Sequence, residues 1–187
     1  MIKIFSFEPE LFNNNGDQGN IEVLQSVLVA EGMDVQNTQN LVECDFVLIG
    51  DCSLAVLDKF KDSLNALTST LKDRLEKGLP TLIIGRPFEL LASNLGIQLE
   101  IGTRVSKFIE AEFEGIRVWG YHNSEVESPK FFINGAFIGS TLFGPLLAKN
   151  PEVLELLLSE LGVKPKSDFY RRGVELAEKA RQSTTFE

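Results

Sequence analysis

Cysteine and histidine are scarce in this chain of 187 residues, which has two cysteines, Cys44 and Cys52, and one histidine, His122. Two cysteines do not build a disulfide framework, and so few sulfur and imidazole groups give no zinc-site spacing. We therefore expect no metal and no cofactor. The first residues read as a strand and not as a leader peptide, so a reducing cytoplasm is the simplest expected location.

Cations are also in the minority, because 18 Lys and Arg residues face 27 Asp and Glu residues, for a net charge of -9. Phosphate binding needs clustered basic side chains, and Arg171-Arg172 is a lone pair on a predicted helix. No apolar run approaches the roughly 20 residues that span a bilayer. We therefore expect neither nucleic-acid binding nor membrane insertion.

The chain is long enough to bury one good core, so we expect a single domain over residues 1–187, ending in a C-terminal helix and tail at 165–187. Its first half alternates apolar strands with helical spacing. Alternation of this kind predicts an α/β fold with a mostly parallel, doubly wound sheet. The expected strands are 2–7, 34–37, 45–50 and 79–84, and the expected helices are 21–32, 53–77 and 88–95.

The pattern changes after Gly96, where short β-rich segments are separated by turn signals. Glu114-Gly115 and Asn134-Gly135 are predicted hairpin turns. This part is expected to form an antiparallel extension of the sheet, followed by helices at 145–161 and 167–181. The expected strands are 103–109, 111–113, 116–119, 131–133 and 136–139.

In open α/β sheets, ligands bind beyond the carboxyl ends of the strands. Loops 13–20, 50–52, 85–87 and 140–145 are expected to meet at that edge. The third follows the segment LPTLII and opens a helix, which is the strand-turn-helix corner that holds a nucleophile in many α/β enzymes. Here the corner is Gly85-Arg86-Pro87, and none of these side chains can attack a carbonyl.

Four segments carry a resemblance to the glutamine amidotransferase domains of the cobyric acid synthase (CobB/CobQ) type, and most of all to the GatD-type subunit of lipid II isoglutaminyl synthase. The resemblance covers roughly residues 2–162 and implies a class I glutamine amidotransferase-like (flavodoxin-like) three-layer sandwich. It also implies glutamine hydrolysis by an elbow Cys with a His base, and transfer of ammonia to a partner. The four segments are NNNGDQGNIEVL, VLIGD, LIIGRPFELL and STLFGPLLAKNP.

The departures from this family fall on its catalytic positions. Gly85 stands at the Cys position and Phe143 at the His position, and Asp51 replaces a glycine near the oxyanion hole. A carboxylate there would oppose developing negative charge. The leading hypothesis is therefore an inactive binding or scaffold subunit. Its partner would be a Mur-ligase-like protein of cell-wall (peptidoglycan) amidation, and glutamine or a related small molecule a ligand.

Two alternatives remain open from the sequence. One is an active amidotransferase or amidohydrolase with a relocated Cys52/His122 centre, against which stands the reading of Cys52 as a packing residue and of His122 as a surface or loop residue. The other is a small-ligand sensor that uses the old glutamine pocket, which a pocket filled by Phe143 would count against.

The four loops 13–20, 50–52, 85–87 and 140–145 together are called the rim. Five polar residues on or beside it are the candidates for binding a ligand or a partner: Asp17, Asn20, Asp51, Arg86 and Glu89. Asp17 is predicted to cap the helix that begins near Gly19, with its carboxylate on free N–H groups. Arg86 sits at a helix N-terminus, where the dipole disfavours a cation, and Glu89 one turn on is expected to offset it.

Overall fold

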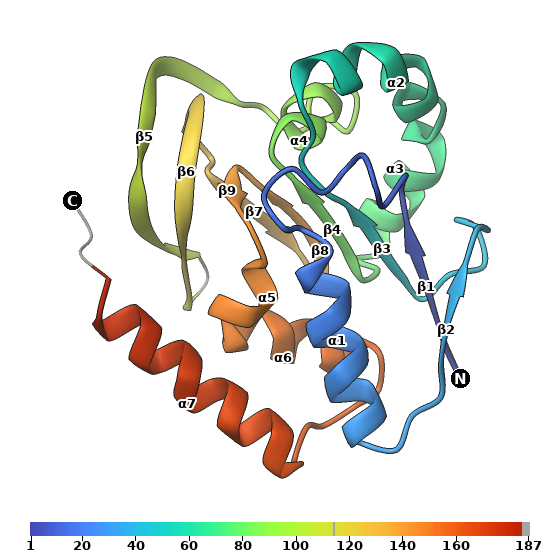
Figure 1. Cartoon of the computed structure of the whole chain (residues 1–187). Coiled ribbons are helices and arrows are strands. Elements are labelled where there is room, and N and C mark those ends of the chain that lie inside the picture. Colours follow the sequence, from blue (N-terminus) through green and yellow to red (C-terminus); the bar gives the residue numbers. More distant parts are fainter. Residues whose placement is uncertain (114, 185–187) are drawn as a thin grey trace.

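The computed structural model describes residues 1–113 and 115–184 and has an α/β architecture with two sheets (Figure 1). In the central sheet, β2, β1, β3, β4 and β8 run parallel in that order, and β7 pairs antiparallel with β8 at one edge. The strands of this sheet are β1 (Ile2–Ser6), β2 (Val35–Thr38), β3 (Phe46–Ile49), β4 (Thr81–Ile84), β7 (Phe131–Asn134) and β8 (Phe137–Ser140).

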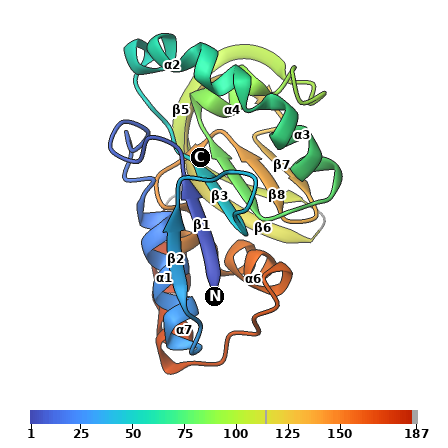
Figure 2. The same ribbon diagram turned by 90° about the vertical axis from the view of Figure 1, so that its right-hand side faces the viewer.

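Helices cover both faces of this sheet, which confirms the predicted layered α/β fold (Figure 2). Central strands are buried on both faces, and successive residues alternate between two apolar clusters: Leu82 and Ile84 face one cluster, and Ile83 faces the other. The helices are α1 (Gly19–Ala30), α2 (Leu54–Ala66), α3 (Thr68–Glu76), α4 (Arg86–Leu91), α5 (Leu146–Lys149), α6 (Pro151–Glu160) and α7 (Asp168–Gln182).

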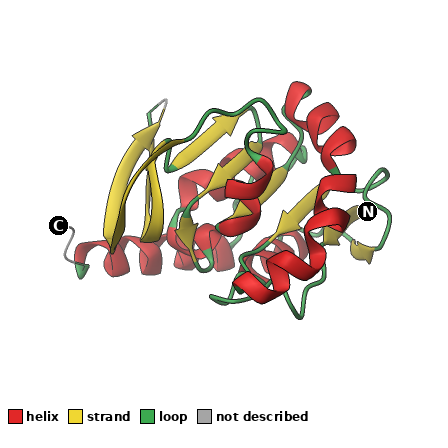
Figure 3. Ribbon diagram, turned by 90° about the horizontal axis from the view of Figure 1, so that it is seen from above, coloured by secondary structure: helices red, strands yellow, loops and turns green. Residues whose placement is uncertain are grey.

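The expected antiparallel extension is divided between two sheets. Only β7 extends the central sheet, whereas β5 (Glu100–Phe113), β6 (Ile116–Ser128) and the short β9 (Leu142–Phe143) form a second sheet beside it (Figure 3). The segments expected as separate short strands are continuous in β5 and β6, because the two strands pair along most of their length. The predicted Asn134-Gly135 turn joins β7 and β8; Glu114 of the other predicted turn lies outside the described residues.

Two predicted long helices are broken. The segment 53–77 forms α2 and α3, which meet at Leu67, and Ser53 caps α2 as expected by accepting the Val56 N–H at 3.3 Å. The segment 145–161 forms α5 and α6. Asn150 between them is extended at φ -127° and ψ 83°, as the residue before a proline tends to be.

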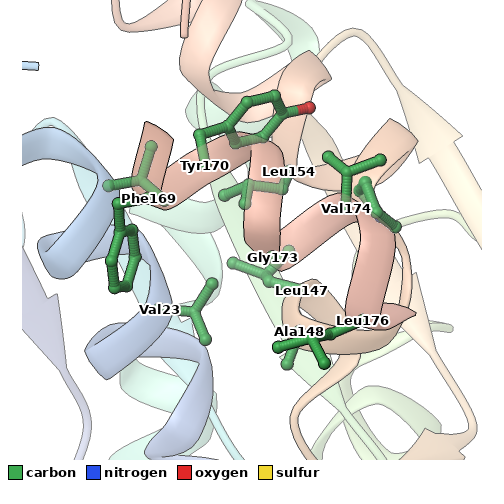
Figure 4. A pocket seen from close by; sticks show the side chains of 11 residues that line it. Val23, Leu147, Ala148, Leu154, Phe169, Tyr170, Gly173, Val174 and Leu176 are labelled. Atoms are coloured by element: carbon green, nitrogen blue, oxygen red, sulfur yellow. The ribbon is translucent and has the colours of Figure 1, made fainter. Parts of the chain in front are cut away.

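The C-terminal helix α7 packs across α1, α5 and α6. Beside it lies an apolar groove of about 240 Å³, in which Gly173 faces Val23, Leu147 and Leu154 from the other helices (Figure 4). Phe169 and Leu176 flank the groove and are 54% and 66% exposed. The apolar stripe of α7 is therefore only partly covered by the described chain.

Candidate functional site

The expected meeting of four loops at the carboxyl edge of the sheet is present in the structure. Asn14 of the first loop donates its backbone N–H to the carbonyl of Asp51 in the second, at 3.1 Å. Gly85 of the third donates its N–H to the carbonyl of Ser140 in the fourth, at 2.7 Å. These bonds fix the loops of distant strands to one another, so the rim is a preformed feature of the fold.

Asp51 is the centre of the rim, and its side chain is completely buried. Its Oδ2 accepts the side-chain amides of Asn14 and Asn15 at 3.1 and 2.9 Å. Its Oδ1 accepts the backbone N–H of Arg86 at 3.1 Å, and the Arg86 guanidinium pairs with Oδ2 at 3.3 Å. A carboxylate out of water needs such donors and a paired cation. Asp51 is therefore a satisfied structural anion and is not available as a base.

Gly85 has the backbone of a nucleophile elbow but no room for a side chain. Its φ of 66° and ψ of -134° lie where L-residues are strained. A Cβ placed there would lie 2.5 Å from Oδ1 of Asp51 and 2.8 Å from the ring of Phe143. Both candidate catalytic positions thus lie in contact, and the space for a nucleophile is occupied by a carboxylate and an aromatic ring.

The backbone N–H after the elbow residue is also engaged. In elbow hydrolases this N–H helps to bind the oxyanion of the tetrahedral intermediate. Here it belongs to Arg86 and donates to Asp51. The N–H that follows the elbow residue is therefore bound to an internal carboxylate and is not free to bind another anion.

The prediction that Asp17 caps α1 is wrong. The residue at the helix N-cap is Gln18, and no side-chain bond caps the helix. Instead, Oδ2 of Asp17 accepts the backbone N–H groups of Asp51 at 3.2 Å and Asn15 at 3.4 Å. Asp17 therefore joins two loops of the rim and does not cap the helix.

The environment of Asp17 favours its protonated form. Burial is the largest influence and Asp51 adds repulsion, and together they raise the pKa of Asp17 to about 6 although backbone N–H groups oppose the shift. Its Oδ1 has no hydrogen-bond partner among the described residues. The charge of Asp17 therefore changes close to neutral pH.

Asn20 is a structural residue in this arrangement. Its amide donates to the carbonyl of Asp17 at 2.9 Å, and its oxygen accepts the Leu147 N–H at 2.9 Å. Since it is completely buried, Asn20 ties the start of α1 to α5 and presents nothing to a ligand.

Arg86 and Glu89 do not offset each other as expected. The Arg86 guanidinium pairs with Asp51 and donates to the Cys52 carbonyl at 2.9 Å. Glu89 accepts the hydroxyl of Ser124 at 2.6 Å. The positive charge of Arg86 at the start of α4 is therefore balanced by Asp51, which lies on the neighbouring loop after β3 and is distant only in the sequence.

Arg86 and Glu89 do line a shared groove of about 470 Å³ beside the elbow. Its other walls come from α2 and from the β5/β6 hairpin, and they add Arg104 and Glu125. Sequence reasoning missed these hairpin residues, because no local pattern indicates that β6 pairs with β9 and so approaches the elbow. The groove presents charges of both signs next to the filled nucleophile position.

The relocated pair, Cys52 and His122, lacks the surroundings of a nucleophile and a base. Both side chains are completely buried. Burial and the neighbouring Asp51 raise the pKa of the Cys52 thiol to about 12, so almost no thiolate forms at neutral pH. Cys52 belongs to the apolar cluster under α2 and α4, as the packing interpretation predicts.

The prediction that His122 is a surface or loop residue is wrong, because it is buried on β6. Its Nδ1 lies 3.0 Å from the hydroxyl of Thr141. Burial is the main cause that lowers the pKa of His122, with Lys130 contributing. The ring is therefore neutral near pH 7 and belongs to the interior of the second sheet.

Lys149 is a further rim residue that the sequence pattern did not single out. Its ammonium donates to the carbonyl of Phe143 at 2.9 Å and lies 5.8 Å from the centre of the Trp119 ring. Burial lowers its pKa, while the charge of Asp17 acts in the opposite direction. Lys149 thus holds the strand that carries Phe143 against the elbow.

Within the described ranges, no three His, Cys, Asp or Glu side chains are gathered so as to hold a metal ion. No helix there combines the length and apolarity needed to cross a bilayer.

Comparison with known proteins shows the fold. No family model and no curated protein matches the chain. A glutamine amidotransferase from Thermotoga maritima is similar over 97% of this chain and 92% of its own, with a TM-score of 0.51 and 14% identity. A glutamine amidotransferase from Methylobacillus flagellatus covers 100% and 96% at TM-score 0.47 and 11% identity.

A putative GMP synthase protein from Thermoplasma acidophilum covers 97% of this chain and 96% of its own, with a TM-score of 0.40 and 19% identity. Of these three structures only the first exceeds a TM-score of 0.5, and at its level of identity it speaks for the architecture alone. The chain therefore has the α/β fold of the class I glutamine amidotransferases.

Proposed function

We propose that this chain is a binding or scaffold protein that has the amidotransferase fold without glutaminase chemistry at the elbow. The observation that carries the proposal is the occupied nucleophile position: a Cβ on Gly85 would lie 2.5 Å from Asp51 and 2.8 Å from Phe143. A substrate amide could not reach a nucleophile there, and the adjacent N–H already binds an internal carboxylate.

An ammonia-release assay tests the absence of glutaminase activity. We expect the purified chain to release no ammonia from glutamine above a blank, and Gly85→Cys to release none either, since the space for the thiol is filled. Release that Cys52→Ser abolishes, and that the matched Cys44→Ser change leaves intact, would instead establish the relocated Cys52/His122 centre.

A more specific role is proposed from the resemblance of the chain's loops to the CobB/CobQ and GatD-type domains. In this proposal the chain is a cytoplasmic pseudoenzyme that contacts a Mur-ligase-like subunit in cell-wall amidation. The supporting feature is segment 140–151, where Gly144, Asn150 and Pro151 match the family's motif although Phe143 replaces its base. Co-purification with a Mur-ligase-like protein from the same cell tests it, and failure of the two purified chains to associate at micromolar concentration would contradict it.

The groove beside the elbow is the proposed place for a small ligand of the glutamine type. Arg104 offers a cation for a carboxylate and Glu125 an anion for an ammonium group, while Arg86 and Glu89 line the groove with bonds to Asp51 and Ser124 already made. Titration calorimetry with L-glutamine tests the proposal. We expect Glu125→Gln to weaken binding about tenfold, and the control Glu178→Gln on α7 to leave it unchanged. Absence of heat with the unmodified protein would rule out glutamine as the ligand.

A further inference from the structure

The strand β5 is a long sheet edge. It pairs with β6 on one side, and in the described part of the chain no strand pairs with its other side (Figure 1). Pairing with β6 is continuous from Val105 to Phe113, and the register irregularities lie before that stretch. A regular edge leaves a row of backbone N–H and C=O groups ready to pair with another strand.

Two of the devices that prevent edge pairing are absent from β5: it has no proline, and its regular stretch has no bulge. Charged side chains are present on the strand, so their arrangement decides which partner the edge can accept. Phe108 at its middle is 40% exposed, and its ring lies 5.1 Å from that of Tyr121 on β6. The hydroxyl of Tyr121 is in turn 2.7 Å from that of Ser106. The strand therefore presents an ordered, partly apolar surface at its centre.

The charges along β5 are complementary to those of the same strand running in the opposite direction. Arg104 and Lys107 lie before Phe108, and Glu110 and Glu112 lie after it. Arg104 is one residue before the regular stretch, and its Nε–H donates to Asn123 of β6 at 3.0 Å, which leaves the other N–H groups of its guanidinium for a second partner. A two-fold axis perpendicular to a sheet keeps each side chain on its own face, so pairing centred on Phe108 sets Arg104 opposite Glu112 of the copy. Parallel pairing in register would instead set like charges side by side, which destabilises a sheet.

We propose that this chain forms a two-fold dimer with a second copy of itself by antiparallel pairing of the β5 edges, centred on Phe108. The pairing joins the two three-stranded sheets into one continuous sheet. The line along which the two β5 edges pair is called the seam. Each end of the seam has an Arg104–Glu112 pair, and the two Phe108 rings meet at the two-fold axis. Glu110 is not needed for the seam, because Arg181 of α7 already pairs with it.

The dimer places the seam next to the groove beside the elbow. Arg104 lines that groove, so Glu112 of the second copy would lie at its margin. The proposal rests on the shape and charge of β5 and holds whether or not the groove binds a small molecule.

Sedimentation equilibrium over a range of concentrations tests the dimer, with circular dichroism as the check on folding. We expect Arg104→Glu and Glu112→Arg each to weaken dimerisation about tenfold, because each turns two attractive cross-strand pairs into repulsive ones. The double variant restores opposite charges and should regain most of the affinity. Arg172→Glu, the same charge change on α7, should leave dimerisation unchanged.

Amide hydrogen exchange locates the interface independently of the variants. We expect amides of residues 105–113 to be protected at high protein concentration and to exchange faster on dilution. A monomer at every concentration would overturn the proposal. So would a dimer that shows no concentration-dependent protection at 105–113, since it would use another surface such as the groove beside α7.

Discussion

At the residue scale, Asp51 fills the space beside Gly85 and accepts the N–H of Arg86, so it closes the elbow to other groups. Buried carboxylates are costly unless they are paired and hydrogen-bonded, and Asp51 has Arg86 together with two asparagine amides. The buried carboxylate after β3 is therefore accompanied by a cation at the corner after β4. The two residues stabilise one another only as a pair, so neither is expected to tolerate loss of its partner.

Gly85→Ala should be more destabilising than the same change at Gly16. Both glycines have positive φ, 66° and 76°, but only at Gly85 would the new Cβ meet Asp51 and Phe143; at Gly16 nothing lies within 4 Å. We expect a loss of about 2–4 kcal/mol in the free energy of unfolding for Gly85→Ala, from strain plus overpacking. Gly16→Ala should cost about 1 kcal/mol from strain alone. Urea unfolding measures both, and equal losses would contradict the occupied elbow.

Asp17→Asn should gain in relative stability as the pH rises. The pKa of Asp17 is raised from 3.8 to about 6 in the folded state. A raised carboxyl pKa stabilises the fold below the unfolded value, and this contribution is lost as the pH rises through about 6. The asparagine amide of the variant cannot ionise. We therefore expect the stability of the variant relative to the parent to increase by about 2–3 kcal/mol between pH 4 and pH 7.

Denaturant unfolding at several pH values checks this expectation. Asp34→Asn is the control for the chemical change itself, because that side chain is exposed. A difference between Asp17→Asn and the parent that stays constant with pH would mean that the folded protein does not raise the pKa of Asp17.

The sequence predicted that the loops of Gly85 and Phe143 meet at one edge of the sheet, but it did not predict the contacts of Asp17. Gly85 and Phe143 lie in segments whose resemblance fixed their positions, and the structure places them in contact. Asp17 just before a helix has the local pattern of a cap. The competing backbone donors on the loop after β3 are far away in sequence, and no local pattern contains them.

At the element scale, strands and helices with strong periodicity were predictable, and their interruptions were not. β1, β3 and β4 lie where apolar runs predicted strands. The break before Pro151 has a sequence signal, the proline itself. The break at Leu67 is slight, since Leu67 keeps helical angles of -78° and -12°. The sequence predicted that β5 and β6 belong to an antiparallel extension, but it could not show that they form a separate sheet, because their pairing partner β9 is distant in the sequence.

Gly173→Ala should stabilise the protein through α7. Gly173 lies inside this helix, and a Cβ there would meet no atom within 4 Å. Alanine restricts the unfolded chain and favours the helix, so we expect a gain of about 0.5–1 kcal/mol. Thermal unfolding measures the gain. The same change at Gly32, where φ is 81°, should lower stability, and a loss at both positions would show that the groove beside α7 is already filled.

Arg74→Met should be strongly destabilising because this buried arginine joins three elements. From α3 it donates to the hydroxyl of Thr81 at 2.9 Å and to the carbonyls of Cys44, Asp45 and Pro80 at 3.0, 3.1 and 2.7 Å. Methionine fills similar space but removes the charged donor from all four acceptors, of which the Pro80 carbonyl keeps the Val47 N–H at 3.1 Å, at an expected cost of about 3 kcal/mol. Urea unfolding measures it, with the exposed Arg172→Met as control. Equal stability of the two variants would contradict a structural role.

At the scale of the whole molecule, one sheet separates two apolar clusters. The cluster on the side of α1 and α5–α7 includes Leu28, and the cluster on the side of α2–α4 includes Leu64. Alternate residues of β3 and β4 belong to the two clusters. Loss of packing on one face of the sheet therefore also weakens the packing of the same strands on the other face. We infer from this sharing that the chain unfolds as one cooperative domain.

Leu64→Ala and Leu28→Ala test that cooperativity with a single natural probe. Both leucines are completely buried, so each change should cost about 2–5 kcal/mol. The one tryptophan, Trp119, lies on β6 outside the cluster that holds Leu64. If the molecule is one unit, Leu64→Ala should lower the urea midpoint of Trp119 fluorescence and of far-UV circular dichroism together, as Leu28→Ala should. A fluorescence transition left unchanged by Leu64→Ala, while circular dichroism shifts, would mean that the α2–α4 face unfolds separately and that the rim loops connect two independent halves.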